Sequence, residues 1–356
     1  MTRTLLSGIC LLLSLTAAAA EFSPDVRPGA GVTERRLLSD YFAPLADTAM
    51  DTEVFILDSG VPGAAGLMIG GTHGNELAGQ VAALLAVENV TVVRGKLLVI
   101  PYVNRSAMSM QDSRNAVARH HRIESRSGER YLPYGNRRTD PADQGVPDPG
   151  RYTNPPGYTL ENGAESRNLN RTYPGKADGT PTERLAWAVM QLVRAEAIDF
   201  TLDMHEADTP ERKPAGEADY RPGGNKRLAY TLVAHPRGLE TAAFALLEME
   251  ADTGISMKLE ESNSTYRGLS HIEIGDNSPA VSFLSESPNP GQDRWREDPD
   301  VVSDTRYPVT HRAGLHLRLF KHLADAHGEA TGKRLEMTGI PEYDELMAGP
   351  IGRFLN

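Results

Sequence analysis

The sequence predicts an α/β fold with a mixed, largely parallel sheet flanked by helices. Three observations support this fold class. Apolar runs of strand length alternate along the chain with longer segments in which apolar residues recur at helical spacing. The strand-like runs are almost continuously apolar, which is typical of strands buried on both faces. The chain also shows no internal repeat and no glycine pattern of a nucleotide-binding loop.

The expected elements follow this alternation from the first strand to a closing helix. Short apolar runs predict strands at 53–59, 64–71, 95–104, 198–205, 227–236 and 279–287. Longer segments with apolar residues at helical spacing predict helices at 75–89, 181–197, 238–254 and 308–327. The helix at 181–197 begins with Pro and Thr, which are typical of a helix start. In sheets of this kind, ligand sites form where strands end and loops begin.

Length and composition limit the function classes. The chain has 356 residues, of which 40% are hydrophobic and 24% charged, enough for one large α/β domain or two small ones. Its formal net charge of −11 argues against a nucleic-acid partner held by phosphate contacts.

The first twenty residues, "MTRTLLSGICLLLSLTAAAA", have the composition of a secretory signal peptide. One Arg precedes a short apolar stretch and a run of alanines, and cleavage is expected after Ala20. The apolar stretch is too short to span a membrane. Because Cys10 is the only cysteine, the mature chain would have neither disulfides nor a thiol nucleophile. We therefore expect an exported protein, periplasmic or extracellular, without a membrane span in its mature form.

After the signal peptide (1–20), we expect a single catalytic domain at 21–330 and a C-terminal tail at 331–356. The segment 136–165 interrupts the alternation, since it is rich in Arg, Asp, Pro and Gly and has little apolar periodicity. A loop of this length inside a domain is either functional or a flexible surface insertion.

His73 and Glu76 stand where the strand 64–71 gives way to a helix, in "IGGTHGNELAG". Three residues apart, their side chains are able to reach the same point, and imidazole nitrogen and carboxylate oxygen are ligands of zinc. His205 ends another apolar strand in "TLDMHEAD", which would complete a set of three ligands. Asp203 on the same strand face would either support a ligand histidine or be a buried structural residue.

Other polar residues follow later strands and turns. Asn170 and Arg171 form an amide–guanidinium pair beside a Pro-Gly turn, and arginine binds carboxylates through paired hydrogen bonds. Glu286 follows a buried strand, where a carboxylate is able to move a proton. We interpret His235 and His271 as ordinary strand-end or loop residues.

The four segments "GGTHGNE", "NLNRTYPG", "LDMHEA" and "SFLSE", in this order and at these spacings, resemble the zinc carboxypeptidase-like superfamily. The succinylglutamate desuccinylase/aspartoacylase branch is the more similar one. Two departures stand out. Asn168 replaces the more usual Asp of "DLNR". Because few residues follow the closing helix, we also expect the β-rich C-terminal domain of aspartoacylases to be missing.

The resemblance implies one zinc ion held by His73, Glu76 and His205, with Asn170 and Arg171 binding the substrate carboxylate. Glu286 would be the general base and acid. The branch has an Arg-Tyr pair before "DLNR", which here implies Arg130 on the oxyanion side, provided that 136–165 is an insertion. Arg167 and Arg151 are rivals for that role. The resemblance also implies that Tyr266 contacts the substrate.

The leading hypothesis is an exported zinc hydrolase that cleaves an amide bond next to a free carboxylate. Its substrate would be either a small peptide, as for a metallocarboxypeptidase, or an N-acyl amino acid, as for a deacylase. The alternative is a non-catalytic metal- or peptide-binding protein on the same fold. A serine hydrolase is excluded because the chain has no G-x-S-x-G elbow.

Overall fold

The computed structural model of the chain describes residues 22–111, 117–211, 228–263 and 265–356. The expected signal peptide at 1–20 lies outside the described residues. Within the described ranges, no helix combines the length and the apolar character needed to cross a membrane.

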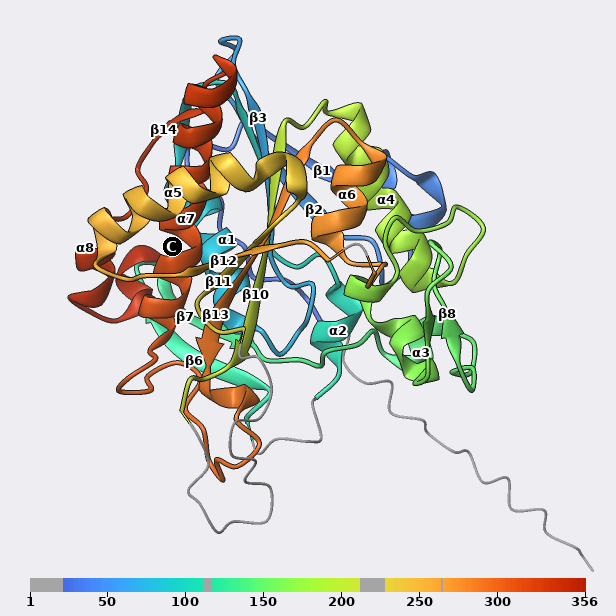
Figure 1. The fold of residues 1–356 in the computed structure, drawn as a ribbon. Coiled ribbons are helices and arrows are strands. Elements are labelled where there is room, and N and C mark those ends of the chain that lie inside the picture. The colour runs from blue at the N-terminus through green and yellow to red at the C-terminus, as the bar shows by residue number, and fades with distance from the viewer. Residues whose placement is uncertain (1–21, 112–116, 212–227, 264) are drawn as a thin grey trace, which may run out of the picture.

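One large sheet runs through the centre of the molecule (Figure 1). Its eight strands lie in the order β1-β2-β5-β3-β10-β13-β11-β12. In that order their bounds are Glu34–Leu37, Glu53–Asp58, Lys96–Ile100, Ala65–Ile69, Phe200–Asp208, Val281–Asn289, Thr231–Ala234 and Lys258–Glu261. The central pairs β5–β3, β3–β10 and β10–β13 are parallel, as is β11–β12, while β1–β2, β2–β5 and β11–β13 are antiparallel. The sheet is therefore mixed and largely parallel, as predicted.

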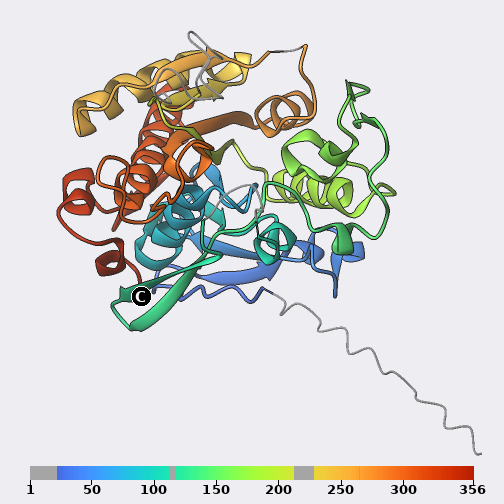
Figure 2. The same cartoon turned by 90° about the horizontal axis from the view of Figure 1, so that it is seen from below.

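Three small two-stranded ribbons lie outside this sheet. They are β4 (Thr91–Arg94) with β14 (Glu336–Thr338), β6 (His120–Ser125) with β7 (Gly128–Pro133), and β8 (Tyr152–Thr153) with β9 (Thr159–Leu160). Figure 2 shows the β6–β7 hairpin beside the C-terminus, where Ser125 Oγ donates to the carbonyl of Asn356 at 2.9 Å.

The helices cover both faces of the sheet. They are α1 (Leu77–Asn89), α2 (Arg105–Ser109), α3 (Pro141–Gln144), α4 (Pro181–Ala195), α5 (Leu239–Thr253), α6 (Ser270–Asn277), α7 (Val309–Thr331) and α8 (Tyr343–Met347). Short 3₁₀ turns lie at Leu38–Asp40, Ala43–Leu45, Gly163–Arg167, Leu169–Arg171, Pro236–Gly238, Pro290–Gln292 and Ile351–Phe354. Helices α1, α5 and α7 lie on one side of the sheet, and α4 and α6 lie on the other (Figure 1).

The side chains of strand β3 pack into two hydrophobic cores, one on each face of the sheet. Its side chains alternate between the faces, so Met68 packs in the core that α1 and α7 cover, while Leu67 and Ile69 pack in the core under α4. All three are fully buried. This explains why the run is continuously apolar rather than alternating, as is usual for a strand covered on both faces.

The elements predicted from the apolar periodicity are present, with ends that differ by a few residues. Two segments fold more fully than the sequence suggested. Residues 136–165 contain α3, β8 and β9. Residues 331–356 pack onto the main body, because β14 pairs with β4 and the side chain of Leu355 is fully buried.

Candidate metal centre and its surroundings

The turn after β3 carries the first two candidate ligands. Gly71 has φ +70°, a conformation that favours glycine, and a Cβ there would meet Tyr102 Cα and Pro101 O at 3.0 Å. Gly79 in α1 approaches β10 so closely that a Cβ would lie 2.4 Å from Met204 O. Tight packing of α1 against β10 thus brings this turn to the end of that strand. Glu76 is the N-cap residue of α1, so it lies just before the helix and not in its first turn.

His73, Glu76 and His205 converge in the interior of the protein. Glu76 Oε1 lies 2.7 Å from His73 Nδ1, and Oε2 lies 2.8 Å from His205 Nδ1. The two Nδ1 atoms are 3.2 Å apart. The three side chains offer ligand atoms within 4.8 Å of one another and are buried. A tetrahedral zinc ion with bonds of about 2.0–2.1 Å separates its ligands by roughly 3.4 Å, so the cluster fits one such ion.

Each histidine also has a polar neighbour at its outer nitrogen. His73 Nε2 lies 2.9 Å from Asn168 Oδ1, and His205 Nε2 lies 2.9 Å from Asp203 Oδ2. Asp203 accepts hydrogen bonds from Thr72 Oγ1 at 2.8 Å and Ser270 Oγ at 2.6 Å. His73 Nε2 is hydrogen-bonded, whereas His205 Nε2 is close to the Asp203 carboxylate without hydrogen-bond geometry. Both rings turn Nδ1 toward Glu76, and neighbours of this kind orient ligand histidines.

The charges in the cluster shift its pKa values in opposite directions. Burial, followed by the charge of Arg137, lowers the pKa of His73 to about 4. Burial disfavours charge on His205 too, but the carboxylates of Asp203 and Glu76 outweigh it and raise that pKa well above its usual value. Burial opposes ionisation of Glu76, yet the two histidines hold its pKa well below the usual range. A buried anion between two imidazoles is an environment that favours a cation.

A buried network stands behind Glu76. The backbone N–H of Glu206 donates to Glu76 Oε2 at 3.2 Å, and Gln292 Nε2 donates to Oε1 at 3.1 Å. The side chain of Glu206 points to the other face of β10, where it accepts from the backbone N–H of Ala78 at 2.9 Å and pairs with Arg312 at 2.5 Å. This pair ties β10 to the start of α1 and to α7, so both chain segments that carry ligands are held in place.

The pairing of two strands places Glu286 next to the cluster. In the parallel pairing of β10 and β13 it is the register partner of His205, so both side chains project from the same face. The residue is partly exposed, but Oε2 is buried and has no hydrogen-bond partner among the described residues. Burial raises the pKa of Glu286 to about 8, partly offset by the charge of His205. A carboxyl group tuned in this way is suited to exchanging a proton near neutral pH.

The structure corrects the prediction for Arg130. Its side chain is buried in an ion pair with Glu88, with Nη1 2.8 Å from Oε1. Glu88 stands twelve residues after Glu76 along α1, and that length of helix rises about 18 Å. Arg130 therefore lies at the far end of α1 from the cluster. The mismatch arises because β7, which carries Arg130, turns toward the C-terminal segment, where Nη1 also donates to Asn356 O at 3.2 Å.

Neither rival arginine reaches the cluster through a contact in the structure. Arg167 pairs with Asp148 at 2.7 Å, and Arg151 pairs with Glu161 on the surface. Among the described residues, Arg137 does contact it, with Nη1 3.3 Å from Glu76 Oε1 and 26% of its side chain exposed. Sequence reasoning missed Arg137 because it lies inside the segment 136–165, which has no periodic pattern and several arginines.

Asn170 and Arg171 are connected to the cluster through Asn168, and Tyr266 contacts Arg171. Asn170 follows Asn168, the partner of His73, by two residues, and its Oδ1 accepts from Ser270 N at 2.8 Å. The guanidinium of Arg171 lies over the ring of Tyr266, with Cζ 5.2 Å from the centroid. Burial, followed by repulsion from Arg137, lowers the pKa of Arg171. Two arginines that repel each other beside a candidate metal site favour an anionic ligand.

The replacement of Asp by Asn at position 168 has a local reason. Asn168 Oδ1 faces His73, and its Nδ2 donates to Glu165 Oε2 at 2.7 Å. An aspartate at this position would set two carboxylates against each other. Asn168 therefore suits a chain in which the segment 136–165 supplies Glu165.

The two histidines interpreted as ordinary residues have local partners. His235 Nε2 lies 3.1 Å from Asp276 Oδ1, and His271 Nδ1 lies 2.6 Å from Ser262 Oγ. Neither belongs to the cluster. His235 directly follows β11, as expected, whereas His271 lies in helix α6 and not at a strand end or in a loop, so the prediction was wrong for His271.

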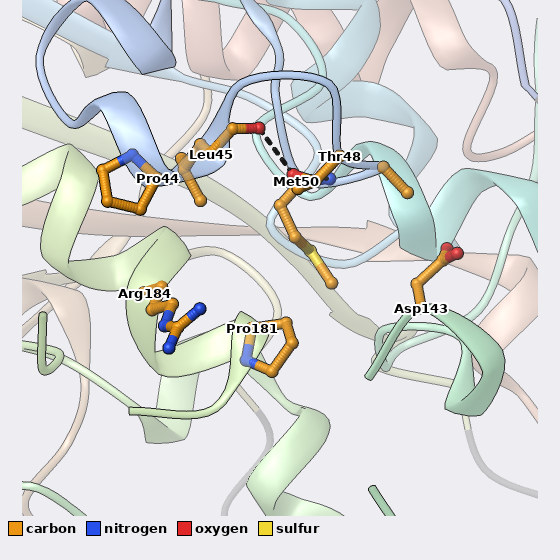
Figure 3. A pocket seen from close by; sticks show the side chains of 8 residues that line it. Pro44, Leu45, Thr48, Met50, Asp143, Pro181 and Arg184 are labelled. Carbon is orange, nitrogen blue, oxygen red and sulfur yellow. Dashed lines mark hydrogen bonds between the residues drawn. The ribbon is translucent and has the colours of Figure 1, made fainter. Parts of the chain in front are cut away.

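Figure 3 shows a separate hollow with a volume of about 100 Å³. Pro44, Leu45, Thr48, Ala49, Met50, Asp143, Pro181 and Arg184 line it. It does not include any of the candidate ligands or their hydrogen-bond partners, so the chemistry of the cluster is not located there.

Comparisons with known proteins agree with the motifs. The profile of the succinylglutamate desuccinylase/aspartoacylase catalytic domain matches residues 62–264, more than half of the chain. None of the curated proteins matches the chain.

Several solved structures are similar in fold. A succinylglutamate desuccinylase from Silicibacter sp. TM1040 is 18% identical with a TM-score of 0.42, covering 78% of this chain and 61% of that one. The apo form of cell shape determinant protein Csd4 from Helicobacter pylori is 13% identical with a TM-score of 0.48, covering 83% and 58%. A succinylglutamate desuccinylase/aspartoacylase from Rhodobacter sphaeroides is 16% identical with a TM-score of 0.43, covering 78% and 59%.

This chain thus spans about three fifths of the length of the structures that it resembles. The match of the family profile covers the turn with His73 and Glu76, the "NLNR" segment and His205. The chain belongs to the succinylglutamate desuccinylase/aspartoacylase catalytic domain family, a family of hydrolases.

Proposed function

We propose that this protein is an exported, zinc-dependent hydrolase that cleaves an amide bond next to a free carboxylate. The observation that carries the proposal is the convergence of His73, Glu76 and His205 with Glu286 on one face of the sheet. Three ligands of this type, with a carboxyl group beside them, make up the donor set of a catalytic zinc site.

Zinc held by His73, Glu76 and His205 would polarise the scissile carbonyl and make water acidic enough to react near neutral pH. Glu286 would accept a proton from the attacking water and return it to the leaving nitrogen. Glu286 Oε2 is buried and has no hydrogen-bond partner among the described residues, so it is available for this exchange.

Arg137 and Arg171 would each stabilise a different negative charge, one that develops during the reaction and one that the substrate already carries. Arg137 lies next to Glu76, so its guanidinium is placed to stabilise negative charge that develops on the carbonyl oxygen. Arg171 and Asn170, which are connected to the cluster through Asn168, would bind the free carboxylate. Tyr266 covers Arg171 and would contact the substrate there.

Two substrate classes fit this arrangement, a small peptide with a free C-terminus and an N-acyl amino acid. Both present a carboxylate near the scissile amide. Among the similar solved structures, Csd4 is described as a D,L-carboxypeptidase and has been solved with a bound tripeptide, whereas the Silicibacter protein is described as a desuccinylase.

Export is proposed from the sequence of residues 1–20, with release of the mature chain after Ala20. Determining the N-terminal residue of the protein recovered outside the cytoplasm tests this part. Glu21 at the N-terminus supports export and cleavage, whereas a protein retained in the cytoplasm with residues 1–20 intact contradicts it.

The activity is tested by offering the zinc-loaded chain a panel of N-acyl amino acids and short peptides, each beside its C-terminal amide. The proposal expects release of an amine from members with a free carboxylate and a much higher KM for the matching amides. A zinc-loaded protein that binds such ligands and hydrolyses none of them would instead be the non-catalytic binding protein of the alternative hypothesis.

A further inference from the structure

Asn170 and Arg171, the residues proposed to bind the substrate carboxylate, are called here the carboxylate clamp. A second aromatic side chain, from the segment 136–165, packs behind Tyr266 next to this clamp. Tyr158 directly precedes β9, and its ring meets Tyr266 edge-on, with centroids 5.0 Å apart and planes inclined by 63°. Tyr266 in turn contacts the guanidinium of Arg171 at 5.2 Å. One side chain therefore separates Tyr158 from the clamp.

The backbone of the β8–β9 hairpin is tied to the same place. Asn154, in the turn of the hairpin, is buried and makes two hydrogen bonds. Its Oδ1 accepts from Tyr158 N at 2.8 Å, and its Nδ2 donates to Arg267 O at 2.9 Å. Asn154 thus holds the turn that presents Tyr158 and the residue that follows Tyr266.

Gly268 shows how tightly these segments meet. It has φ +91°, and a Cβ on it would lie 2.3 Å from Asn154 Nδ2 and 2.4 Å from Arg171 O. Its carbonyl accepts from Tyr173 N at 3.2 Å. The hairpin, the loop with Tyr266 and the loop with Arg171 therefore pack as one unit, and a side chain at position 268 would separate them.

The side chain of Arg171 is mostly buried, but apart from its contact with Tyr266 the guanidinium is fixed by few hydrogen bonds. Its Nη1 donates to the neighbouring carbonyl of Asn170 at 2.5 Å, and its Nε has no hydrogen-bond partner among the described residues, with Glu165 Oε2 3.7 Å away. A long side chain in this state loses rotamer freedom when a ligand binds, which weakens binding. If the ring of Tyr266 is held against Arg171 before the ligand binds, less rotamer freedom of Arg171 is lost on binding.

We propose that Tyr158 is a positioning residue of the carboxylate clamp, which acts by holding Tyr266 against Arg171. The inference rests on the proposed function and adds to it a role for the β8–β9 hairpin. The segment 136–165 thereby contributes to the site twice, through Arg137 beside Glu76 and through Tyr158 behind Tyr266.

A positioning role for Tyr158 predicts which kinetic constant changes when Tyr158 is replaced. The free carboxylate is bound equally in the ground state and in the transition state, so its weakened binding raises KM and leaves kcat nearly unchanged. Loss of an aromatic contact of this kind corresponds to an increase in KM of about three- to tenfold, with kcat within about twofold.

The experiment compares Tyr158→Ala, Tyr158→Leu and Tyr158→Phe with the wild type in the full zinc-loaded chain. Each is assayed on one good substrate and on its C-terminal amide, and the Kd of the free amino acid product is measured by calorimetry. Tyr131→Ala, which removes an exposed tyrosine from the β6–β7 hairpin, is the matched control. The Ala and Leu variants should raise KM and Kd, while the Phe variant and the control should match the wild type.

The amide separates positioning from general loosening, because it has no carboxylate for Arg171 to bind. Its KM should be the same in wild type and Tyr158→Ala. Equal KM and Kd values for the acid in these two proteins would overturn the inference, as would an equal rise for acid and amide. A wild type that binds the amino acid but hydrolyses nothing overturns the proposed activity alone, since the Kd comparison still tests Tyr158. A wild type that neither binds the amino acid nor hydrolyses any substrate overturns both the proposed activity and the role of Tyr158.

Discussion

Glu286 lies directly beside His205 in the parallel pairing of β10 and β13, on the same face of the sheet. The sheet itself thus sets the geometry between a candidate ligand and a candidate proton carrier. Strands are among the most rigid places to hold such a pair, because each backbone is fixed by hydrogen bonds on both sides.

Replacing Glu286 by Gln should lower kcat by about 10²–10⁴-fold, the usual contribution of general acid–base catalysis. The zinc content should remain that of the wild type, because Glu286 is not one of the three clustered ligands. Steady-state kinetics and metal analysis of the same preparation check both statements. Glu261→Gln, an exposed carboxylate at the end of β12, is the control. Wild-type turnover in Glu286→Gln would remove Glu286 from the mechanism.

Arg137 and Arg130 should respond differently to truncation. Arg137→Ala should lower kcat by about 10²–10³-fold, as expected when one donor to a developing oxyanion is lost. Arg130→Ala should lower the free energy of unfolding by about 3–5 kcal/mol, because it leaves Glu88 buried without its ion-pair partner. Kinetics at saturating substrate and urea denaturation of both variants test this. The reverse pattern, with Arg130 needed for turnover in a stable protein, would restore the assignment from the sequence.

The side-chain amide of Asn168 should be required for the full stability of the fold. Asn168→Asp sets a second carboxylate against Glu165 and should reduce the free energy of unfolding by about 1–3 kcal/mol, the cost of a buried polar group left without its hydrogen bond. Adding Glu165→Gln to the same chain should recover most of that loss. Denaturant unfolding of the two single variants and the double variant forms the cycle that isolates the pair. Strictly additive effects would mean that the contact between residues 165 and 168 contributes nothing.

His311 should contribute to acid sensitivity of the fold. Burial, followed by the charge of Arg312, lowers its pKa to about 4, and its ring bonds to Tyr230 Oη at 2.9 Å and to Tyr343 Oη at 2.5 Å. The unfolded chain binds a proton below pH 6.5, whereas the folded chain resists protonation until about pH 4. Stability is therefore lost as pH falls through that window, and retained above it.

Between pH 7 and pH 5 the wild type should lose about 1–2 kcal/mol more of its unfolding free energy than His311→Gln. Denaturant unfolding of both proteins at the two pH values gives this difference directly, since the other titrating groups are common to both. Equal losses would show that His311 titrates alike in the folded and unfolded chains.

The sequence was sufficient for six of the eight strands of the main sheet and for the four longest covering helices, because these elements carry strong apolar patterns, but it did not predict α6. It was also sufficient to select His73, Glu76 and His205, because strand ends in an α/β sheet collect at one edge. What it did not show is that β3 and β10 are neighbours, the relationship that brings residues 132 positions apart within 3.2 Å.

The remaining differences have local causes. The edge strands β1 and β12 are short and mostly exposed, so they carry little apolar periodicity. Arg130 was selected from its place in the sequence, whereas its burial beside Glu88 depends on how the β6–β7 hairpin folds back. The segment 136–165 has the composition of a loop, yet it supplies Arg137, Tyr158 and Glu165. Its contacts are made by single polar and aromatic side chains, which leave no repeating pattern to recognise.

The central claim is that His73, Glu76 and His205 hold one metal ion, and metal analysis tests it most directly. The purified wild-type chain, incubated with zinc and freed of excess, should carry about one zinc per chain, the stoichiometry of a three-ligand catalytic site. His205→Ala should carry little or none, while His235→Ala, which removes a strand-end histidine paired with Asp276, should match the wild type. A wild-type chain that binds no metal, or a His205→Ala chain that binds zinc as tightly as the wild type, would contradict the account.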